Sequence, residues 1–400
     1  MLTSLSLIFL VGLAMGAICS KLKLPRIIGM LATGIILGPY VLDLLDPSIL
    51  SISAELRKMA LVIILLKAGL SLNLQDLKKV GRPAIMLSFV PATFEIIGYI
   101  LLAPVILGLT HTEAAVMGAV LSAVSPAVVI PRMVQLMDSQ YGTDQAIPQM
   151  IMAGASCDDI FVIVLFTTFL SMAQGGGINL TSFLNIPISI ILGILLGAIV
   201  GYGLYLFFET AYARKHYVRN SMKVIIVLGF SFLLIAIEGW LESKIAISGL
   251  LAVVSMACVL KVKSIAFVSK RLSEKFGKLW LAAEVMLFVL VGAAVDIRYT
   301  LEAGFAAILM IFAALLFRTV GVLLCTFKTR LSVKERLFCV IAYLPKATVQ
   351  AAIGSVPLAA GLPCGKIILS VAVMAIIITA PLGALGMDAT YKKLLSHAES

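Results

Sequence analysis

About thirteen apolar runs, each long enough to cross a lipid bilayer, alternate with short polar connections along this chain. A spanning helix needs roughly 20 apolar residues. Of the 400 residues, 61% are hydrophobic and only 13% are charged, and the mean hydropathy is +1.12. A soluble protein of this length needs a more polar surface. The chain is therefore predicted to be an all-α polytopic membrane protein.

The predicted spanning segments follow the apolar runs, and the first run is expected to be retained because it lacks the basic start of a signal peptide. The segments are residues 2–20, 27–44, 55–72, 82–107, 112–136, 148–173, 184–208, 220–238, 244–260, 278–295, 302–326, 332–358 and 364–388.

Lysine and arginine are unevenly divided between the two alternating sets of connections. One set holds most of the 31 basic residues, at 21–26, 78–82, 132, 214–223, 261–278, 328–336 and 392–393. The other set holds Arg57, Lys58, Lys244, Arg298 and Lys366. Basic loops stay on the cytoplasmic side, so the amino terminus is predicted to lie outside and the carboxyl terminus in the cytoplasm.

This charge pattern also explains the net charge of +11 without a nucleic-acid partner. The basic stretch at 261–278 is expected either to lie along the cytoplasmic membrane surface or to form a solvated loop. A bacterial cytoplasmic membrane is the expected location.

Two adjacent carboxylates, Asp158 and Asp159, lie in the middle of the apolar run 148–173. Ionisable residues at this depth are costly and indicate function. Neighbours on a helix point about 100° apart, so one carboxylate can face a binding site while the other faces a neighbouring helix. Such a carboxylate can hold either a proton or a small cation, and oxygen ligands suit the hard ions Na⁺ and Li⁺. We therefore predict that Asp158 and Asp159 bind Na⁺ or Li⁺.

Other charged residues lie within predicted spans, namely Lys67, Glu95, Arg318, Lys346 and, nearer an end, Glu284. Basic and acidic residues nearly balance, which indicates pairing. Glu95 and Arg318 are expected to form a buried ion pair, and the alternative partner of Arg318 is one of the aspartates. Because arginine keeps its proton, Arg318 is expected to serve structure or charge balance. Lys67 is expected to pair or to extend towards the membrane surface.

The second half of the chain repeats features of the first. The sequence AVV at 127–129 follows Pro126, and ATV at 347–349 follows Pro345, about 220 residues later. Glu95 and Arg318 are separated by a similar interval. The first six and the last six segments would then be two copies of opposite topology, since one segment lies between them. Secondary transporters are commonly built from such inverted repeats.

Two repeat-related segments, 112–136 and 332–358, carry prolines beside polar residues. Proline removes a backbone donor and clashes with the preceding turn. We predict discontinuous helices at Pro126 and Pro131 in the first segment and at Pro345 and Lys346 in the second; ordinary kinks are the alternative. Unpaired backbone at this depth must face protein or a water-filled cavity. The charge of Lys346 would offset the carbonyl ends of the half-helices.

The predicted cation site also draws on hydroxyl groups near the aspartates. Ser125, Ser156 and Thr348, together with carbonyls of the broken helices, are expected to complete the oxygen shell. The six cysteines are scattered without a CxxC pair, and the three histidines are far apart in the sequence. The sequence therefore predicts neither a disulfide framework nor a His/Cys metal site.

Three motifs resemble the monovalent cation–proton antiporter superfamily and are closest to its sodium/proton antiporter B branch. They are AVSPAVVIP at 123–131, GASCDDI at 154–160 and LPKATVQAAIGSV at 344–356. The third is the most specific, and the resemblance covers about residues 1–390. It implies a sodium–proton-antiporter fold in which the discontinuous segments 112–136 and 332–358 cross near the bound ion.

The resemblance also implies a division of the chain and a transport cycle. Residues 82–173 and 302–388 would form a mobile core, and residues 1–72 and 220–295 a dimerisation domain, joined by the linking helix 184–208. The core would move against the dimer as an elevator. Asp159 would be the principal carrier of cation and proton, assisted by Asp158.

The family has electrogenic members, which often pair the first aspartate with a lysine, and electroneutral members with arginine in that place. This chain combines Asp158 and Asp159 with Arg318 and Glu95. Because Arg318 does not cycle a proton, we expect one-for-one, electroneutral exchange. Electrogenic or K⁺-selective exchange is the alternative.

The leading function is therefore antiport of Na⁺ or Li⁺ against H⁺ by a homodimer in lipid, with a role in pH homeostasis, without enzymatic activity and without a cofactor beyond the transported ions. An intramembrane aspartyl protease would need two aspartates facing each other from separate helices. A channel would show a filter motif or rings of charge. A same-fold, sodium-coupled organic-anion transporter would not need adjacent aspartates.

Overall fold

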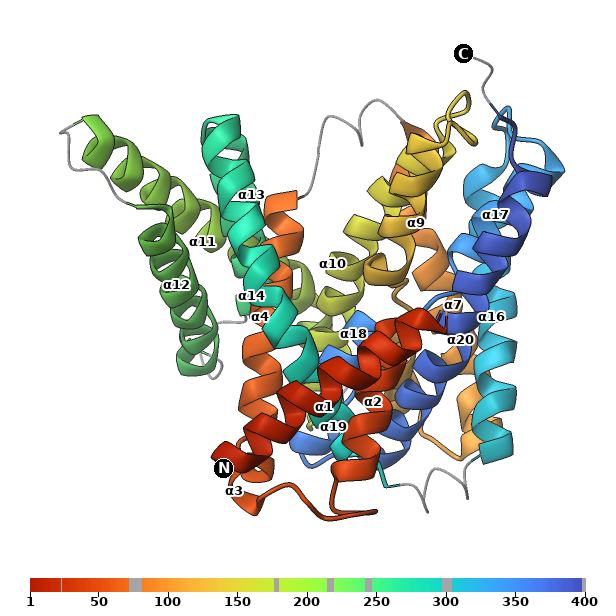
Figure 1. The fold of residues 1–400 in the computed structure, drawn as a ribbon, viewed down its shortest axis with the longest axis horizontal. Coiled ribbons are helices and arrows are strands. Elements are labelled where there is room, and N and C mark those ends of the chain that lie inside the picture. The colour runs from red at the N-terminus through yellow and green to blue at the C-terminus, as the bar shows by residue number, and fades with distance from the viewer. Residues whose placement is uncertain are drawn as a thin grey trace. The chain divides into compact units, whose positions relative to one another are not determined.

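The structure, a computed structural model, describes residues 1–22, 24–71, 81–175, 180–213, 219–241, 247–296 and 304–397. Within these ranges the chain forms helices, turns and one isolated β-bridge (Figure 1). The helices are α1 (Leu2–Lys21), α2 (Arg26–Leu37), α3 (Pro47–Ser51), α4 (Ser53–Ser71), α6 (Arg82–Leu87), α7 (Val90–Leu107), α8 (His111–Leu121), α9 (Pro126–Asp138), α10 (Ile147–Ala173), α11 (Leu180–Ala213), α12 (Asn220–Leu241), α13 (Gly249–Lys263), α14 (Ala266–Ala293), α16 (Gly304–Thr326), α17 (Val333–Ala342), α18 (Thr348–Ile353), α19 (Val356–Ala359) and α20 (Gly365–Leu394).

Each predicted spanning segment overlaps at least one of these helices, although some segments are helical only in part and others contain more than one helix. In the described ranges, eight helices are long and apolar enough to cross a membrane. They are Leu2–Lys21, Arg82–Leu107, Ile147–Ala173, Ile191–Thr210, Asn220–Leu241, Val268–Ala293, Gly304–Thr326 and Gly365–Leu394. The chain is therefore an all-α membrane protein, as its composition predicts.

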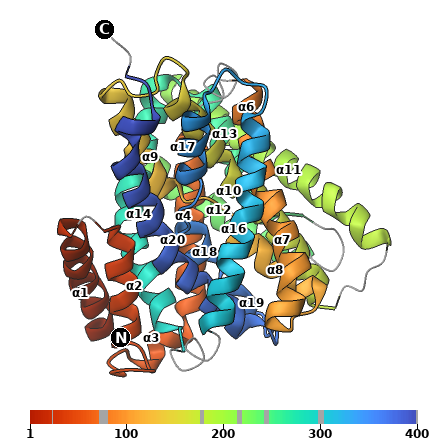
Figure 2. The same ribbon diagram turned by 90° about the vertical axis from the view of Figure 1, so that its right-hand side faces the viewer.

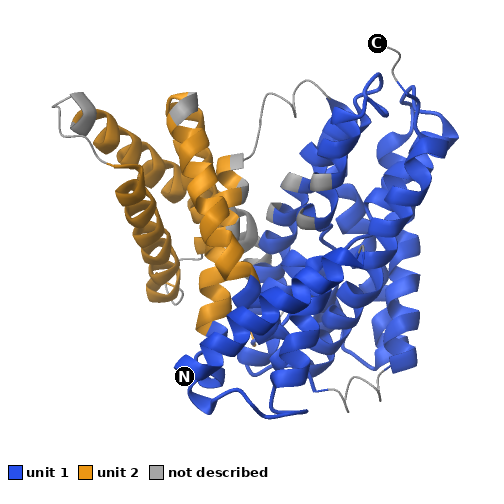
Figure 3. Cartoon of the chain, in the orientation of Figure 1, with its two compact units in different colours: residues 1–54, 73–174, 285–400 blue, residues 55–72, 175–284 orange. Residues whose placement is uncertain are grey.

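The chain divides into two compact units (Figure 3). Unit 1 comprises residues 1–54, 73–174 and 285–400, and unit 2 comprises residues 55–72 and 175–284. The two aspartates and the candidate ligands predicted around them all belong to unit 1.

Unit 2 contains a tight seam between α11 and α13. Gly193, Gly197 and Gly201 recur every four residues along α11 and so lie on one helix face. A Cβ atom added to Gly197 would lie 2.1 Å from the carbonyl oxygen of Ala252, which leaves no room for a side chain. Small residues at this spacing allow two membrane helices to pack backbone against backbone.

Unit 1 shows the predicted repeat most clearly in two helix starts. α8 begins with a capping box formed by Thr110 and Glu113, and α17 begins with a capping box formed by Ser332 and Glu335, about 220 residues later. In each box the hydroxyl of the capping residue accepts a hydrogen bond from the backbone N–H of the glutamate. The carboxylate of that glutamate accepts a hydrogen bond from the backbone N–H of the capping residue. Each of these helices then stops after about three turns.

Both repeat-related segments are interrupted. Residues 122–125 separate α8 from α9, and residues 343–347 separate α17 from α18. Figure 2 shows that the first pair rises from α8 to α9, whereas the second pair descends from α17 to α18. Opposite directions are what an inverted repeat requires. We refer to residues 122–125 as the first interruption and residues 343–347 as the second interruption.

The prolines do not all act as predicted. Pro126 is the first residue of α9, where its missing N–H costs no helical bond, and Pro345 lies in the second interruption. The prediction that Pro131 also breaks the helix is wrong, because α9 continues through it to Asp138. Membrane helices tolerate proline where neighbouring groups bond to the freed backbone.

The basic stretch 261–278 also differs from expectation. It is neither a separate surface helix nor a loop, because α13 extends to Lys263 and α14 begins at Ala266 and runs on as one helix to Ala293. Leu272 and Phe276 are buried, 4% and 0% exposed. These two residues, four positions apart, give the stretch an apolar face that extends the membrane helix.

Candidate functional site

The two aspartates lie near the middle of α10 and are both buried, with Asp158 0% and Asp159 7% exposed. Around them stand α7, which carries Glu95, α16, which carries Arg318, and the two interruptions. α16 packs along α7, and α10 packs against α8 and α9. The repeat therefore brings residues from both halves of the sequence to one place.

The two interruptions are bonded to each other. The backbone N–H of Ser125, in the first interruption, donates to the carbonyl oxygen of Pro345, in the second, at 2.8 Å. The backbone N–H of Val124 donates to Oδ2 of Asp158 at 2.7 Å. Because the backbone of the first interruption is not helical, its N–H groups are free to bond other partners. The N–H of Val124 bonds Asp158 in this way.

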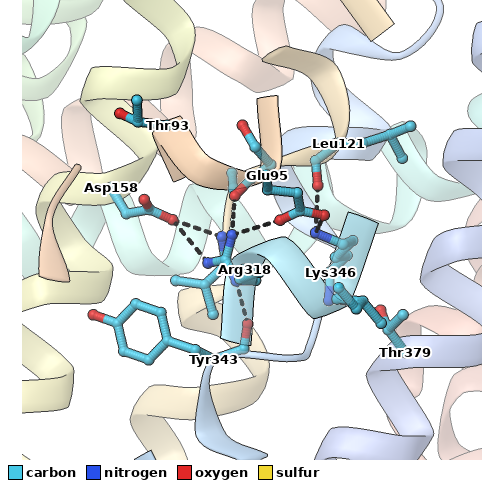
Figure 4. Close-up of polar contacts among 12 residues, drawn as sticks. Thr93, Glu95, Leu121, Asp158, Arg318, Tyr343, Lys346 and Thr379 are labelled. Atoms are coloured by element: carbon cyan, nitrogen blue, oxygen red, sulfur yellow. Dashed lines mark hydrogen bonds and ion pairs between the residues drawn. The ribbon is translucent and has the colours of Figure 1, made fainter. Parts of the chain in front are cut away.

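Arg318 is fully buried and joins four partners (Figure 4). Its Nη1 is 2.8 Å from Oε2 of Glu95, and its Nη2 is 3.4 Å from Oδ2 of Asp158. The two pairings weighed from the sequence therefore occur together.

The guanidinium group of Arg318 also covers both carbonyl-terminated helix ends. Its Nε donates to the carbonyl oxygen of Tyr343 at 2.6 Å, and its Nη1 donates to the carbonyl oxygen of Ser122. These carbonyls follow α17 and α8 respectively, where the last backbone acceptors have no partner within the helix. A positive charge at the end of each half-helix also opposes the helix dipole.

Lys346 lies in the second interruption and is also fully buried. Its Nζ is 2.6 Å from Oε1 of Glu95 and donates to the carbonyl oxygen of Leu121, the last residue of α8, at 2.5 Å. Its backbone N–H donates to Oγ1 of Thr379 at 3.0 Å. The charge of Lys346 therefore meets a carbonyl helix end, as well as a carboxylate that the sequence did not assign to it.

Together, Glu95, Asp158, Arg318 and Lys346 form what we call the compensated cluster, in which two acidic and two basic residues are linked by ion pairs. Asp159 stands apart. Its Oδ1 is buried without a hydrogen-bond partner, and no ion pair to it is found among the residues that the structure describes. The adjacent carboxylates therefore have different electrostatic surroundings.

The predicted ligand oxygens remain available. Oγ of Ser125, Oγ1 of Thr348 and Oδ1 of Asp158 are buried and have no hydrogen-bond partner within the described ranges. The side chain of Ser156, also predicted as a ligand, lies outside the described part. Buried polar atoms are normally paired, so these unpartnered oxygens are available as ligands.

Sequence reasoning missed four contributors to the site: Ser122, Tyr343, Gln350 and Thr379. Ser122 and Tyr343 act through backbone carbonyls, which leave no mark on the choice of residue. Gln350, whose Nε2 donates to the carbonyl oxygen of Ala123 in the first interruption, had a visible signal, because it is a polar residue inside the apolar third motif.

Lys67, the remaining basic residue predicted within a span, belongs to unit 2. Its Nζ lies 5.9 Å from the centre of the Trp280 ring, a cation–π arrangement. This contact agrees with a role in packing.

Comparisons with known proteins all match this chain to sodium/hydrogen exchangers. The sequence profile of the family described as "Sodium/hydrogen exchanger, transmembrane" matches residues 5–392. The chain is 31% identical over 432 residues to sodium/hydrogen exchanger 9B2 of Xenopus tropicalis, covering 99% of this chain and 75% of that protein. It is 32% identical over 389 residues to sodium/hydrogen exchanger 9B2 of Homo sapiens, covering 94% and 71%.

The fold has a solved counterpart as well. The structure matches that of the sodium proton antiporter MjNhaP1 from Methanocaldococcus jannaschii with a TM-score of 0.84 and 22% identity, over 98% of each chain. At this identity the likeness establishes the fold alone, and that fold is the one the three sequence motifs imply.

Proposed function

The chain belongs to the sodium/hydrogen exchanger family, and from this membership we propose that it exchanges Na⁺ or Li⁺ for H⁺ with Asp159 as the carrier. Members of this family are transporters rather than enzymes, and cation–proton antiport is the activity that this membership supports. The identity of the carrier residue, the choice of cation and the stoichiometry are our proposals.

The observation that carries the proposal is the contrast between the neighbouring aspartates. Asp158 is held by the N–H of Val124 and by Arg318. Asp159 is buried beside it and forms no ion pair with the residues that the structure describes. A buried carboxylate without a partner must bind a proton or a cation to avoid standing as a bare charge. Competition of the two for one carboxylate is the basis of exchange.

The cation would be held by oxygens from three elements. Asp159 and Asp158 come from α10, Ser125 from the first interruption and Thr348 from the start of α18, with Ser156 as a further candidate. Hard monovalent cations favour such oxygen ligands. In this arrangement the discontinuous segments cross beside the ion.

One-for-one exchange follows from the compensated cluster. Arg318 keeps its proton at all relevant pH values, and Asp158 stays engaged with it, so one carboxylate remains to alternate between proton and cation. If Asp158 also released and took up a proton, the exchange would become electrogenic, which is the runner-up. K⁺ selectivity and sodium-coupled organic-anion transport on the same fold are the remaining alternatives.

The transport cycle is proposed to be an elevator movement. Both interrupted helix pairs and α10 lie within residues 82–173 and 302–388, which we assign to the mobile core. Residues 1–72 and 220–295 would form the dimerisation domain of a homodimer, with 184–208 as the linking helix. The uneven distribution of basic residues favours a cytoplasmic carboxyl terminus, which we include in the proposal. A bacterial host membrane remains a prediction, since the relatives named above are vertebrate and archaeal.

The test uses purified protein in liposomes that enclose a pH-sensitive dye. Na⁺, Li⁺ and then K⁺ are added, with and without a clamped membrane potential. The proposal expects Na⁺ or Li⁺ to drive proton movement in the wild type, independently of the potential, and expects none with Asp159→Asn. Cation-driven proton movement in a folded Asp159→Asn variant would rule out Asp159 as the carrier. A rate that follows the potential would favour the electrogenic alternative.

A further inference from the structure

Tyr343 contacts two parts of the site with its two ends. It follows α17 in the second interruption and is 0% exposed. Its carbonyl oxygen accepts the bond from Nε of Arg318 at 2.6 Å, and its ring centre lies 5.5 Å from the central guanidinium carbon. In Figure 4 the ring extends to the side of Arg318 on which Asp158 lies. The backbone of Tyr343 is thus bonded to Arg318, and its side chain leads away from that bond.

The hydroxyl group of Tyr343 lies against α10 at Gly154. A Cβ atom added to Gly154 would lie 2.2 Å from Oη of Tyr343, so the oxygen occupies the place where a side chain would begin. This oxygen is buried and has no hydrogen-bond partner among the described residues. Its contact with α10 is therefore a packing contact, for which glycine leaves room and alanine does not.

Gly154 and Asp158 are one helical turn apart, so they lie on the same face of α10. A path of contacts leads from Arg318 through Tyr343 to Gly154. One turn of α10 then leads to Asp158, whose Oδ2 is 3.4 Å from Nη2 of Arg318. Because this path closes on itself, the length of the Tyr343 side chain sets how far α10 lies from the second interruption.

The contact between Arg318 and Asp158 is the one most sensitive to this spacing. At 3.4 Å it is longer than the roughly 2.8 Å typical of a charge-assisted hydrogen bond. Arg318 is held more closely by Glu95 on α7, at 2.8 Å, and by the carbonyl oxygen of Tyr343, at 2.6 Å. The guanidinium group would therefore stay with α7 and the second interruption if α10 moved away.

We propose that Tyr343 is a positioning residue that keeps Arg318 against Asp158 and thereby limits the exchange to one proton per cation. The proposal rests on the exchange proposed above, in which Asp158 stays engaged with Arg318 while Asp159 alternates between proton and cation. If α10 and Arg318 separate, Asp158 becomes free to release and take up a second proton. Uptake of one Na⁺ against the exit of two protons moves one positive charge outwards in each cycle, so the exchange becomes electrogenic.

Gly154→Ala tests the spacing, because its methyl group would strike the Tyr343 hydroxyl and push α10 from the second interruption. Na⁺-driven proton exit is measured in the dye-loaded liposomes at clamped potentials. We expect the wild type to ignore the potential and Gly154→Ala to be accelerated when the interior is positive. At a full stoichiometry of two protons, a tenfold change in the steady-state Na⁺ gradient corresponds to about 60 mV.

Tyr343→Phe is the compensating substitution, because it removes only the oxygen that the new methyl group would strike. The other atoms of Tyr343 lie at least 3.5 Å from the added Cβ position, since the third nearest atom there, the carbonyl oxygen of Ala84, is at that distance. The methyl group also meets Cβ of Leu87 at 2.8 Å, but the single and double variants share this contact. We expect the double variant Gly154→Ala/Tyr343→Phe to regain exchange that is independent of the potential.

Melting temperatures test the same spacing without relying on transport. If Gly154→Ala already separates Arg318 from Asp158, Asp158→Asn has less left to remove in that background. We expect Asp158→Asn to lower the melting temperature of Gly154→Ala by about half of what it takes from the wild type, or less. Gly12→Ala is the control, because it adds a methyl group 2.9 Å from the Val285 side chain, where α1 meets the end of α14. Its loss should add to that of Asp158→Asn.

The outcomes separate this proposal from the exchange on which it rests. Three results overturn the positioning role: additive losses for Gly154→Ala and Asp158→Asn, potential-independent exchange in Gly154→Ala, or potential dependence that persists after Tyr343→Phe is added. A wild type that exchanges no ions, or whose rate already follows the potential, overturns the proposed function, and the melting temperatures still decide the role of Tyr343. If Gly154→Ala does not fold, Tyr343→Phe alone serves, because it shortens the spacer by one atom. Its loss must then be non-additive with that of Asp158→Asn, and additive losses overturn the proposal.

Discussion

Asp158 and Asp159 are consecutive residues on one helix, yet they belong to different electrostatic regions. The Asp158 carboxylate accepts a backbone N–H and faces the guanidinium of Arg318. Asp159 is almost as deeply buried, and no basic side chain in the described chain pairs with it. Helical geometry causes the divergence, because adjacent side chains point about 100° apart.

The difference teaches that burial alone does not identify the residue that carries an ion. Glu95, Asp158, Arg318 and Lys346 neutralise one another, so the compensated cluster already holds its charges without transported ions. Only a carboxylate left over from such a balance needs a proton or cation. The variants described next test this comparison, from the largest expected effect to the smallest.

Removing the guanidinium group of Arg318, which pairs with both Glu95 and Asp158, should reduce stability the most. Arg318→Met leaves Glu95 and Asp158 without one partner each and exposes the carbonyl ends of α8 and α17. Breaking a buried ion pair in this way costs about 3–5 kcal/mol. Thermal unfolding of the purified protein measures the loss.

Arg318→Lys is the control for Arg318→Met, because it keeps the positive charge. A lysine ammonium group lacks the planar guanidinium of arginine and cannot bond all four partners at once. It should fall between the wild type and the Met variant. A fully stable Arg318→Met protein would mean that the cluster does not hold the interruptions together.

The two aspartates should differ in how much stability the same substitution costs. Asp158→Asn loses a charge-assisted bond from Val124 and a partner of Arg318, which lowers stability by about 1–3 kcal/mol. Asp159→Asn removes an unpaired buried carboxylate and should change stability by less than about 1 kcal/mol. Melting curves of both variants without added Na⁺ provide the comparison, and equal losses would contradict it.

Glu95 and Lys346 should prove energetically coupled. Either Glu95→Gln or Lys346→Met leaves the other charge poorly compensated, whereas the double variant removes both at once. We expect the double variant to be more stable than the sum of the single losses predicts, by about 0.5–3 kcal/mol. Additive losses would indicate that their 2.6 Å contact contributes nothing.

The smallest effect is expected at the helix starts far from the aspartates. Thr110→Ala and Ser332→Ala each remove a capping hydroxyl from α8 and α17 and should cost about 1 kcal/mol. Because these caps belong to the repeat and not to the ion site, the apparent KM for Na⁺ should stay unchanged. A raised KM in either variant would contradict this separation of the helix caps from the ion site.

The sequence predicted the helices well, because long apolar runs leave the backbone few alternatives. It also predicted interruptions near Pro126 and Pro345. It misjudged Pro131, which lies in a continuous helix. A proline shows that one backbone donor is missing, but it does not show whether the surrounding groups compensate.

The charged side chains of the site could be predicted from the sequence, whereas the contacts made by backbone carbonyls could not. Asp158, Asp159, Glu95 and Arg318 stood out in apolar runs. That Arg318 covers the carbonyls of two half-helices was not foreseeable, since any residue supplies a carbonyl. The contact between Lys346 and Glu95 depends on how the two interruptions meet, which only the folded chain reveals.

The most direct test of the central claim counts protons released when Na⁺ binds to purified protein in weak buffer. The account predicts about one proton per bound Na⁺ in the wild type, a similar count in Asp158→Asn if that variant remains folded, and none in Asp159→Asn, because only the carboxylate outside the compensated cluster exchanges one ion for the other. Proton release that persists in Asp159→Asn and is lost in Asp158→Asn would contradict the account and assign the carrier role to the partnered aspartate.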